Sequence, residues 1–186
     1  MLKEIRIHGR GGMGNVTAAE LLAMAAFRDG KYSQAFPSFG AEREGAPVVA
    51  FVRISDQPIR IRQQIYEPDY LIIQDAGLMY MEGVLDGLKR DGMVVVNTVK
   101  DRSELPIPPE VTVRTTPALK IAMDIIGRPL FNVVMVGAFA CASNLVDIEA
   151  VAEAIRDRFP GELGEKEVRA CLEACNEAIK GCEMNE

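Results

Sequence analysis

Glycines and a basic side chain gather near the start of the chain, in the run His8-Gly9-Arg10-Gly11-Gly12-Met13-Gly14-Asn15. Glycines at positions 9, 11 and 14 give the pattern G-x-G-x-x-G, which between a strand and a helix is the fingerprint of a dinucleotide-binding loop. Glycine admits positive φ and lets the backbone come close to another group. A helix that follows such a loop points unpaired N–H groups and the positive end of its dipole at a ligand. The run therefore predicts a cradle for a phosphate or another anion.

The sequence on either side of the run supplies the elements that this cradle needs. Residues 3–7 alternate charged and apolar side chains, as a short strand does, and residues 18–27 are rich in strong helix formers. Classical dinucleotide binding also needs an acidic residue about 20 positions later, but neither Asp29 nor Glu42 follows a clean second strand. Two further interpretations stay open, namely a tight turn that binds nothing and a contact with another subunit.

A second candidate region is the loop from Ser38 to Pro47, which holds charged residues between two expected strands. It is longer than a hairpin needs, and loops of this kind carry function more often than cores do. It is either a solvated turn or a surface that docks on a partner or substrate near the glycines. The candidate ligand-contact or interface residues are therefore Gly9, Arg10, Gly11, Gly12, Met13, Gly14, Asn15, Ser38, Glu42 and Arg43.

Catalytic and metal-binding constellations are not evident in the sequence. His8 is the only histidine, which leaves it either a ligand contact or a structural residue, and no G-x-S-x-G motif occurs. The four cysteines, at positions 141, 171, 175 and 182, form no C-x-x-C pair, and we expect each of them to be a free thiol in or near the core. We therefore single out no catalytic residue and predict no metal site.

Hydrophobic periodicity predicts an α/β layered fold in a single domain, residues 1–186, with a mostly parallel or mixed central sheet, helices on both faces and a helical C-terminal third. Expected strands cover residues 31–36, 48–54, 70–75, 93–97 and 111–115, with a short addition at 59–62. Expected helices cover 78–89, 117–126, 131–143, 147–159 and 166–181. The strand ending at Asp75 places a carboxylate at the edge where open α/β sheets bind ligands.

Composition limits the possible partners. The net charge is −6, which argues against a general role with nucleic acid or membrane surfaces, although Arg53, Arg60 and Arg62 could form a local basic patch. No apolar run approaches the length of a membrane span, and we expect no signal peptide. The sequence predicts a cytoplasmic protein.

Two stretches resemble the gamma subunits of the 2-oxoacid:ferredoxin oxidoreductase family, most closely those for pyruvate. They are residues 8–19, HGRGGMGNVTAA, and residues 32–47, YSQAFPSFGAEREGAP. Pro58-Ile59-Arg60, Pro68-Asp69-Tyr70 and the chain length also fit, and the resemblance spans nearly the whole chain. One departure is Met13, which stands where the family loop usually has glutamine.

The resemblance implies a subunit of an enzyme that interconverts pyruvate and coenzyme A with acetyl-CoA and CO2, with ferredoxin as electron carrier. It implies alpha, beta and delta partner subunits that hold thiamine diphosphate, magnesium and iron–sulfur clusters, while this chain binds none of these cofactors alone. Both loops would then help to form the coenzyme A approach or hold neighbouring subunits.

Three rival hypotheses stay open. The chain could be the gamma subunit of a sister enzyme for 2-oxoglutarate, branched-chain 2-oxoacids or indolepyruvate. It could be a freestanding Rossmann-like nucleotide-binding module. It could also be a purely structural subunit in which neither loop touches a ligand.

Overall fold

A six-stranded mixed sheet forms the centre of the computed structural model, which describes residues 1–38 and 44–183. The strands are β1 (Leu2–Arg10), β2 (Tyr32–Pro37), β3 (Pro47–Ser55), β4 (Tyr70–Ile73), β5 (Met93–Asn97) and β6 (Thr112–Thr116), in the order β2-β3-β1-β4-β5-β6. β1, β4, β5 and β6 run parallel, whereas β3 is antiparallel to both β1 and β2. The carboxyl ends of four parallel strands therefore meet at one edge.

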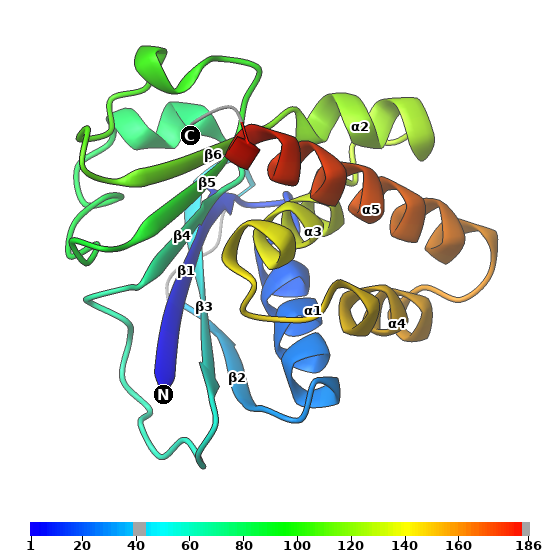
Figure 1. The fold of residues 1–186 in the computed structure, drawn as a ribbon, viewed down its shortest axis with the longest axis horizontal. Coiled ribbons are helices and arrows are strands. Elements are labelled where there is room, and N and C mark those ends of the chain that lie inside the picture. Colours follow the sequence, from blue (N-terminus) through cyan, green and yellow to red (C-terminus); the bar gives the residue numbers. More distant parts are fainter. Residues whose placement is uncertain (39–43, 184–186) are drawn as a thin grey trace.

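The α-helices all pack on one face of this sheet (Figure 1). They are α1 (Asn15–Arg28), α2 (Ala118–Ile125), α3 (Phe131–Ser143), α4 (Ile148–Arg158) and α5 (Glu162–Glu183). α3 is apolar around nearly its whole circumference and lies buried among the other elements, as the sequence predicts. The predicted α/β layered fold with a mixed sheet and a helical C-terminal third is confirmed. The predicted helices on both faces are found only in part, because the described α-helices share one face and the other face carries only 3-10 helices.

Alternate residues of the central strands point to opposite faces and enter two separate cores. Ile72 and Val95 pack against the α-helices, whereas their neighbours Ile73 and Val94 pack on the other face. That second face is covered by the short 3-10 helices η1 (Ala76–Tyr80) and η2 (Arg102–Glu104) and by the segments that connect them to the strands. Burial on both faces explains the nearly continuous apolar sequence of these strands.

The helix predicted for residues 78–89 is wrong, because only η1 and a series of turns occupy this stretch. Gly83 and Gly87 adopt φ of 88° and 72°, which interrupts a right-handed helix. A Cβ at Gly87 would lie 2.0 Å from the carbonyl oxygen of Tyr66, so this glycine also permits a close backbone approach. The side chain of Arg6 fixes the stretch by donating to the carbonyls of Val84 and Asp86 at 2.9 and 2.6 Å.

Two predictions about residues 53–62 are also wrong. Residues 59–62 form no strand, and β3 pairs with β1 and β2 instead. Arg53 cannot join a basic surface patch, because it is fully buried and its Nε donates to Glu4 Oε1 at 2.8 Å. Its Nη2 donates to the Gln63 carbonyl at 2.7 Å, so Arg53 ties the segment after β3 to the sheet.

The expectation of four free thiols is wrong for two cysteines. Cys141 of α3 and Cys175 of α5 form a disulfide, while Cys171 is a free, buried thiol as predicted. The sequence suggested no partner for Cys141, which is 34 residues from Cys175, and only the packing of α3 against α5 brings them together. The side chain of Cys182 lies outside the part of the chain that is described.

Candidate functional site

The glycine run forms the predicted loop between β1 and α1. Gly12 and Gly14 have φ of 91° and 73°, in the left-handed region that glycine favours, and Gly14 is the N-cap residue of α1. A Cβ at Gly9 would lie 2.1 Å from Asn15 Oδ1, and one at Gly14 would lie 2.6 Å from Asn132 Nδ2. These three glycines are therefore required by the backbone and by its close neighbours.

Met13 closes the loop through its sulfur and its backbone. Its N–H donates to the carbonyl of Arg10 at 3.0 Å, and its Sδ accepts from the N–H of Arg10 at 3.3 Å. A thioether is only a weak acceptor. The side chain thus serves the shape of the loop rather than offering a polar group to a ligand.

The loop is also fastened to the chain just before β3. Gly11 donates to the carbonyl of Ala46 at 2.8 Å, and its own carbonyl accepts from the N–H of Gly45 at 3.2 Å. Gly11 and Glu44 form an isolated parallel bridge. The two candidate regions of the sequence are therefore neighbours in space, although Glu42 and Arg43 themselves lie outside the described residues.

A shallow hollow of about 320 Å³ opens at the start of α1. Its lining consists of Arg10, Gly11, Gly12, Gly14, Asn15, Val16, Thr17 and Val48. Within residues 1–38 and 44–183, the backbone N–H groups of Asn15, Val16 and Thr17 have no hydrogen-bond acceptor. Together with the helix dipole, these amides make the hollow suited to a negatively charged group. Ser38 is not among its lining residues.

Arg10 brings a positive charge to the same place. Its Nε donates to Asp75 Oδ2 at 2.5 Å, and its Nη1 donates to the carbonyl of Gly45 at 3.3 Å. Arg10 ends β1 and Asp75 follows β4, so the pair lies at the carboxyl ends of two adjacent parallel strands. The chain leaves β1 toward β2 and β3 on one side, whereas β4 lies on the other side. Open α/β sheets bind ligands in the crevice at such a switch point.

Three amide side chains that the sequence analysis missed form hydrogen bonds that hold the residues of this edge. Gln74 Nε2 donates to Asn15 Oδ1 at 2.6 Å, and Asn97 Nδ2 donates to the Gln74 carbonyl at 3.0 Å. Asn132 Nδ2 donates to the carbonyl of Gly14 at 3.4 Å. Gln74 and Asn97 each stand at the polar end of an apolar strand, and this position could have identified them as candidate site residues from the sequence. Asn132 lies in an apolar helix, and nothing in the sequence marks it as a site residue.

His8 does not reach the hollow. Its side chain is 5% exposed, and Nε2 has no hydrogen-bond partner in the described part of the protein. Burial, reinforced by the positive charge of Arg6, lowers the pKa of His8 to about 3, so the imidazole is neutral. Of the two interpretations of this residue, the structural one fits its position inside β1.

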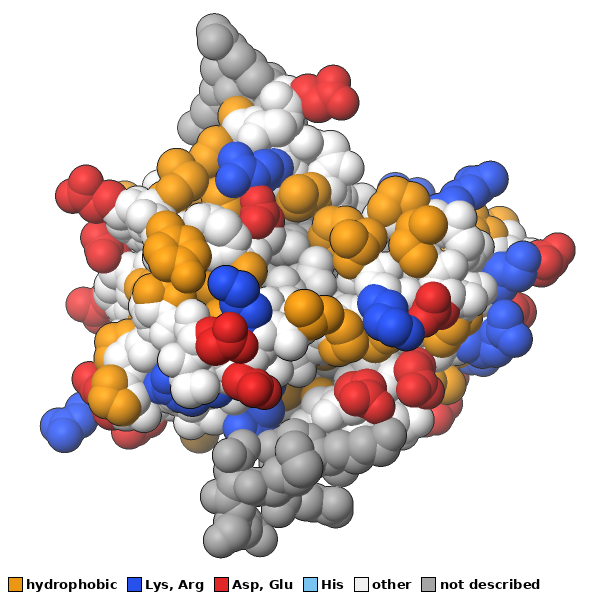
Figure 2. All heavy atoms as spheres, turned by 90° about the horizontal axis from the view of Figure 1, so that it is seen from above, with side chains coloured by type: hydrophobic (Ala, Val, Ile, Leu, Met, Phe, Trp, Pro, Cys, Tyr) orange, Lys and Arg blue, Asp and Glu red, His pale blue; other side chains and the backbone are white. Residues whose placement is uncertain are grey.

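The surface around the carboxyl edge mixes charge and apolar side chains. Figure 2 views the side toward which β1 runs and shows Lys and Arg interspersed with Asp, Glu and hydrophobic residues. Exposed large hydrophobic residues follow the carboxyl ends of β4, β5 and β6, namely Tyr80, Met81, Val99, Leu119 and Met123. Exposed apolar side chains beside a polar site are typical of surfaces that bind other proteins.

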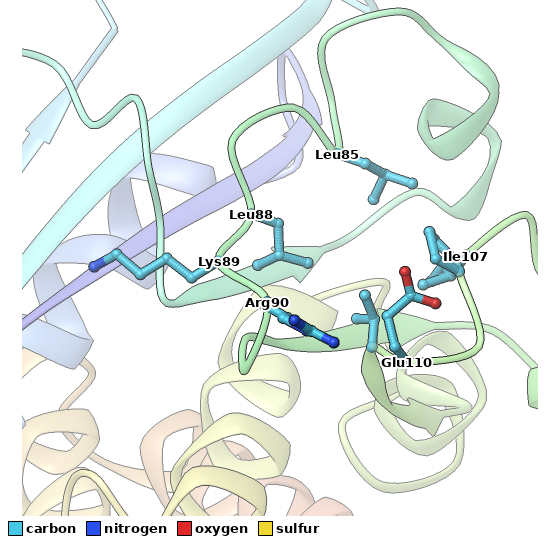
Figure 3. Close-up of a pocket in the computed structure, with 8 residues that line it drawn as sticks. Leu85, Leu88, Lys89, Arg90, Ile107 and Glu110 are labelled. Atoms are coloured by element: carbon cyan, nitrogen blue, oxygen red, sulfur yellow. The ribbon is translucent and has the colours of Figure 1, made fainter.

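A second hollow, of about 440 Å³, lies at the opposite edge of the sheet (Figure 3). Leu85, Leu88 and Ile107 line it, and its other lining residues include Arg90, shortly before β5, and Val111, directly before β6. These are the amino-terminal ends of the strands. The lining of this hollow also includes the charged residues Lys89, Arg90 and Glu110, but, unlike the glycine-loop site, it includes no helix N-terminus.

Comparison with known proteins identifies the family to which the chain belongs. The model of the pyruvate ferredoxin/flavodoxin oxidoreductase family matches residues 4–180. The chain belongs to this family. Among its relatives, pyruvate synthase subunit PorC of Methanocaldococcus jannaschii is 55% identical over 177 residues, which is 95% of this chain and 97% of that protein. The pyruvate/ketoisovalerate oxidoreductases common subunit gamma of Pyrococcus furiosus is 51% identical, over 92% of this chain and 94% of that protein.

Two solved structures have the same fold as this chain. Pyruvate oxidoreductase subunit PORC of Thermotoga maritima superposes with a TM-score of 0.82 at 35% identity, covering 95% of this chain and 96% of that one. A 2-oxoglutarate:ferredoxin oxidoreductase of Magnetococcus marinus matches with a TM-score of 0.81 at 22% identity, where it shows the fold alone. The resemblance to gamma subunits noted in the sequence is confirmed.

The topology disfavours the classical dinucleotide site. β2 follows α1, but β3 lies between β1 and β2 in the sheet. An acidic residue after β2 would then stand two strands away from the glycine loop, roughly 9–10 Å across the sheet. In a classical dinucleotide fold, by contrast, the acid follows a strand adjacent to the first.

Proposed function

We propose that this chain is the gamma subunit of a pyruvate:ferredoxin oxidoreductase, which interconverts pyruvate and coenzyme A with acetyl-CoA and CO2. The names of its relatives support this role, since those of Methanocaldococcus jannaschii and Thermotoga maritima are a pyruvate synthase subunit and a pyruvate oxidoreductase subunit. The chain covers nearly the whole length of both. We propose that it works in the cytoplasm and is inactive by itself.

The cofactors, in this proposal, lie in partner subunits. The described side chains, those of residues 1–38 and 44–178, include no group of three or more His, Cys, Asp or Glu that could hold a metal ion. No helix among the described residues is long and apolar enough to cross a membrane. Thiamine diphosphate, magnesium and iron–sulfur clusters would belong to the alpha, beta and delta subunits, and ferredoxin would receive electrons through them.

The glycine-loop site would serve coenzyme A, whose phosphates carry the negative charge that this site suits. The observation that carries the proposal is the position of Arg10, which stands at the β1–β4 switch point beside three open amides of α1. Arg10 would pair with a phosphate oxygen, and the amides of Val16 and Thr17 would donate to it. The exposed apolar residues of the same edge would contact partner subunits and close the site from outside.

Substrate choice would reside in the other subunits. The Pyrococcus furiosus relative is named as a common subunit of the pyruvate and ketoisovalerate enzymes. A gamma subunit that serves both enzymes cannot by itself select the oxoacid. For this reason a sister 2-oxoacid oxidoreductase is the second candidate function.

Purification of the tagged chain from its own host, without oxygen, tests the proposal. We expect partner subunits containing thiamine diphosphate and iron–sulfur clusters, and an eluate that reduces a viologen dye only when pyruvate and coenzyme A are both present. Activity with 2-oxoglutarate or branched-chain 2-oxoacids in place of pyruvate would support the sister enzyme. A lone chain that binds an adenine nucleotide and lacks oxoacid activity would contradict both and support a freestanding nucleotide-binding module.

A further inference from the structure

The Cys141–Cys175 disulfide joins two helices at the back of the molecule, away from the glycine loop. Cys141 lies near the C-terminal end of α3, and Cys175 lies in the second half of α5. The bond closes a ring of chain that contains the whole of α4. α3, α4 and α5 lie next to one another (Figure 1) and contribute side chains to one core cluster, so the bond reinforces a layer that is already packed.

Solvent reaches this disulfide. Both cysteines line a hollow of about 660 Å³, whose other lining residues are Asp29, Ala140, Asn144, Val146, Asp147 and Ile148. Cys141 is partly buried, whereas Cys175 is 7% exposed. A thiol that enters the hollow can therefore approach the bond, and Cys141 is the more exposed of the two residues.

The third thiol nearby takes no part in this chemistry. Cys171 lies one helical turn before Cys175, and a Cβ at Gly137 of α3 would lie 2.5 Å from its Sγ. Cys171 is fully buried, and this burial raises the pKa of its thiol to about 12. Since only a thiolate attacks a disulfide, Cys171 does not exchange with the neighbouring bond at neutral pH.

We propose that Cys141–Cys175 is a thiol–disulfide exchange site that a dithiol reductant opens in the folded protein. A thiolate of the reductant attacks Cys141 Sγ and forms a mixed disulfide, while Cys175 leaves as a thiolate and takes up a proton. The second thiol of the reductant then attacks its own sulfur in the mixed disulfide and releases Cys141 as a thiol. Two electrons and two protons pass to the chain, and the reductant becomes a disulfide.

The expected cytoplasmic location of the chain supports a disulfide that opens and closes. The cytoplasmic location is part of the proposed function, and most cytoplasmic disulfides are transient, catalytic or redox-sensing. Permanent disulfides do occur inside hyperthermophiles, so a fixed bond that only stabilises the fold is the opposing interpretation. The two differ in whether the bond opens while the chain remains folded.

Alkylation of the purified chain under native conditions tests the proposal, in a Cys182→Ser variant that leaves three cysteines. After incubation with dithiothreitol, we expect iodoacetamide to label Cys141 and Cys175 but not Cys171, as read from peptide masses. Because the bond closes a long loop, its reduction should lower Tm by about 10 °C. A Cys171→Ala control should exchange as the parent does.

Several outcomes would overturn the proposal. In one, the bond persists in dithiothreitol until a denaturant is added, which makes it a fixed staple. In another, all three cysteines are labelled at the same rate, which means that labelling follows global unfolding. The third outcome concerns a chain that is isolated with free thiols. If oxidised dithiothreitol then fails to form the Cys141–Cys175 bond, the proposal is wrong. Loss of exchange in Cys171→Ala would contradict the two-cysteine scheme.

Discussion

Arg10 Nε lies 2.5 Å from Asp75 Oδ2, although 65 positions separate the two residues in the sequence. Both side chains remain partly exposed, at 35% and 26%. The carboxylate offsets a positive charge that would otherwise face the hollow at the start of α1. An anion that enters the hollow therefore meets an arginine already oriented, but partly neutralised, by Asp75.

Opposite changes in coenzyme A use are expected from substitutions of these two residues. Arg10→Gln should raise the KM for coenzyme A in the assembled enzyme roughly tenfold, because the loss of one charge-assisted hydrogen bond weakens binding by about that factor. Asp75→Asn should lower that KM, because Arg10 then keeps its full charge for the phosphate. Steady-state kinetics with pyruvate in excess measures both.

Arg28→Gln is the matched control, since Arg28 also pairs with carboxylates but lies at the far end of α1. It should leave the KM for coenzyme A unchanged. A partly exposed ion pair contributes at most about 1 kcal/mol, so none of the three variants should lose much stability. An unchanged KM in Arg10→Gln, with normal assembly, would contradict the assignment of coenzyme A to this site.

A comparison of two glycines separates backbone strain from close packing. Gly14 and Gly30 have nearly equal φ, 73° and 74°, but only Gly14 has a neighbour, Asn132, in the space that a Cβ would fill. Gly30→Ala should cost about 1–2 kcal/mol for the left-handed conformation alone. Gly14→Ala should cost about 1 kcal/mol more, because Asn132 must give up its bond to the Gly14 carbonyl. Urea unfolding of both variants gives the difference, and equal losses would refute the packing role.

A buried carboxyl in α5 should make stability depend on pH. Glu167 is 1% exposed, and burial raises its pKa from 4.5 to about 7. The folded chain therefore holds this proton more tightly than the unfolded chain, and the free energy of unfolding falls as pH rises from about 4.5 to 7.

The Glu167→Gln variant removes that dependence. Its Tm should exceed that of the parent by a few degrees, roughly 3–6 °C, at pH 8 and should nearly equal it at pH 4. Glu173→Gln, which removes an exposed carboxylate from the same helix, is the control and should show no such difference between the two pH values. Equal Tm at pH 8 for Glu167→Gln and the parent would rule out a buried, protonated Glu167.

His8 offers a direct spectroscopic check, because it is the only histidine in the chain. With a pKa near 3, its imidazole should keep the NMR shifts of the neutral form between pH 8 and pH 5. In denaturant the same signals should titrate near 6.5. The lowered pKa means that stability is lost as pH falls from about 6.5 toward 3. A midpoint near 6 in the folded chain would show that the side chain reaches solvent.

The elements that rest on local patterns were predictable from sequence. The strand, glycine loop and helix at the start of the chain and the buried helix at residues 131–143 follow from composition and periodicity, and the structure confirms them. The false helix at 78–89 shows the limit of this reasoning. Its residues suit a helix, but Gly83 and Gly87 take positive φ because Arg6 and Tyr66, both distant in sequence, hold that backbone.

Long-range pairs set the limit for the site as well. The sequence placed Arg10 in the loop and Asp75 at the ligand-binding edge, but only the order of the strands makes β1 and β4 neighbours. The same holds for Cys141 and Cys175, whose separation carries no signal until α3 packs on α5. Gln74 and Asn97 mark the polar ends of two apolar strands in the sequence, but only the pairing of β4 with β5 shows that the two residues meet.

The unequal cover of the two sheet faces has a consequence for local unfolding. On the second face, β4, β5 and β6 are covered by η1, η2 and irregular segments, whose short turns have few internal hydrogen bonds. Such segments open with less free energy than packed helices do. Amides of residues 74–92 and 98–111 should therefore exchange with deuterium well before those of α1 and α3, while β4 and β5 stay protected by the helices behind them. Local unfolding would then be confined to the face of the sheet that the 3-10 helices cover.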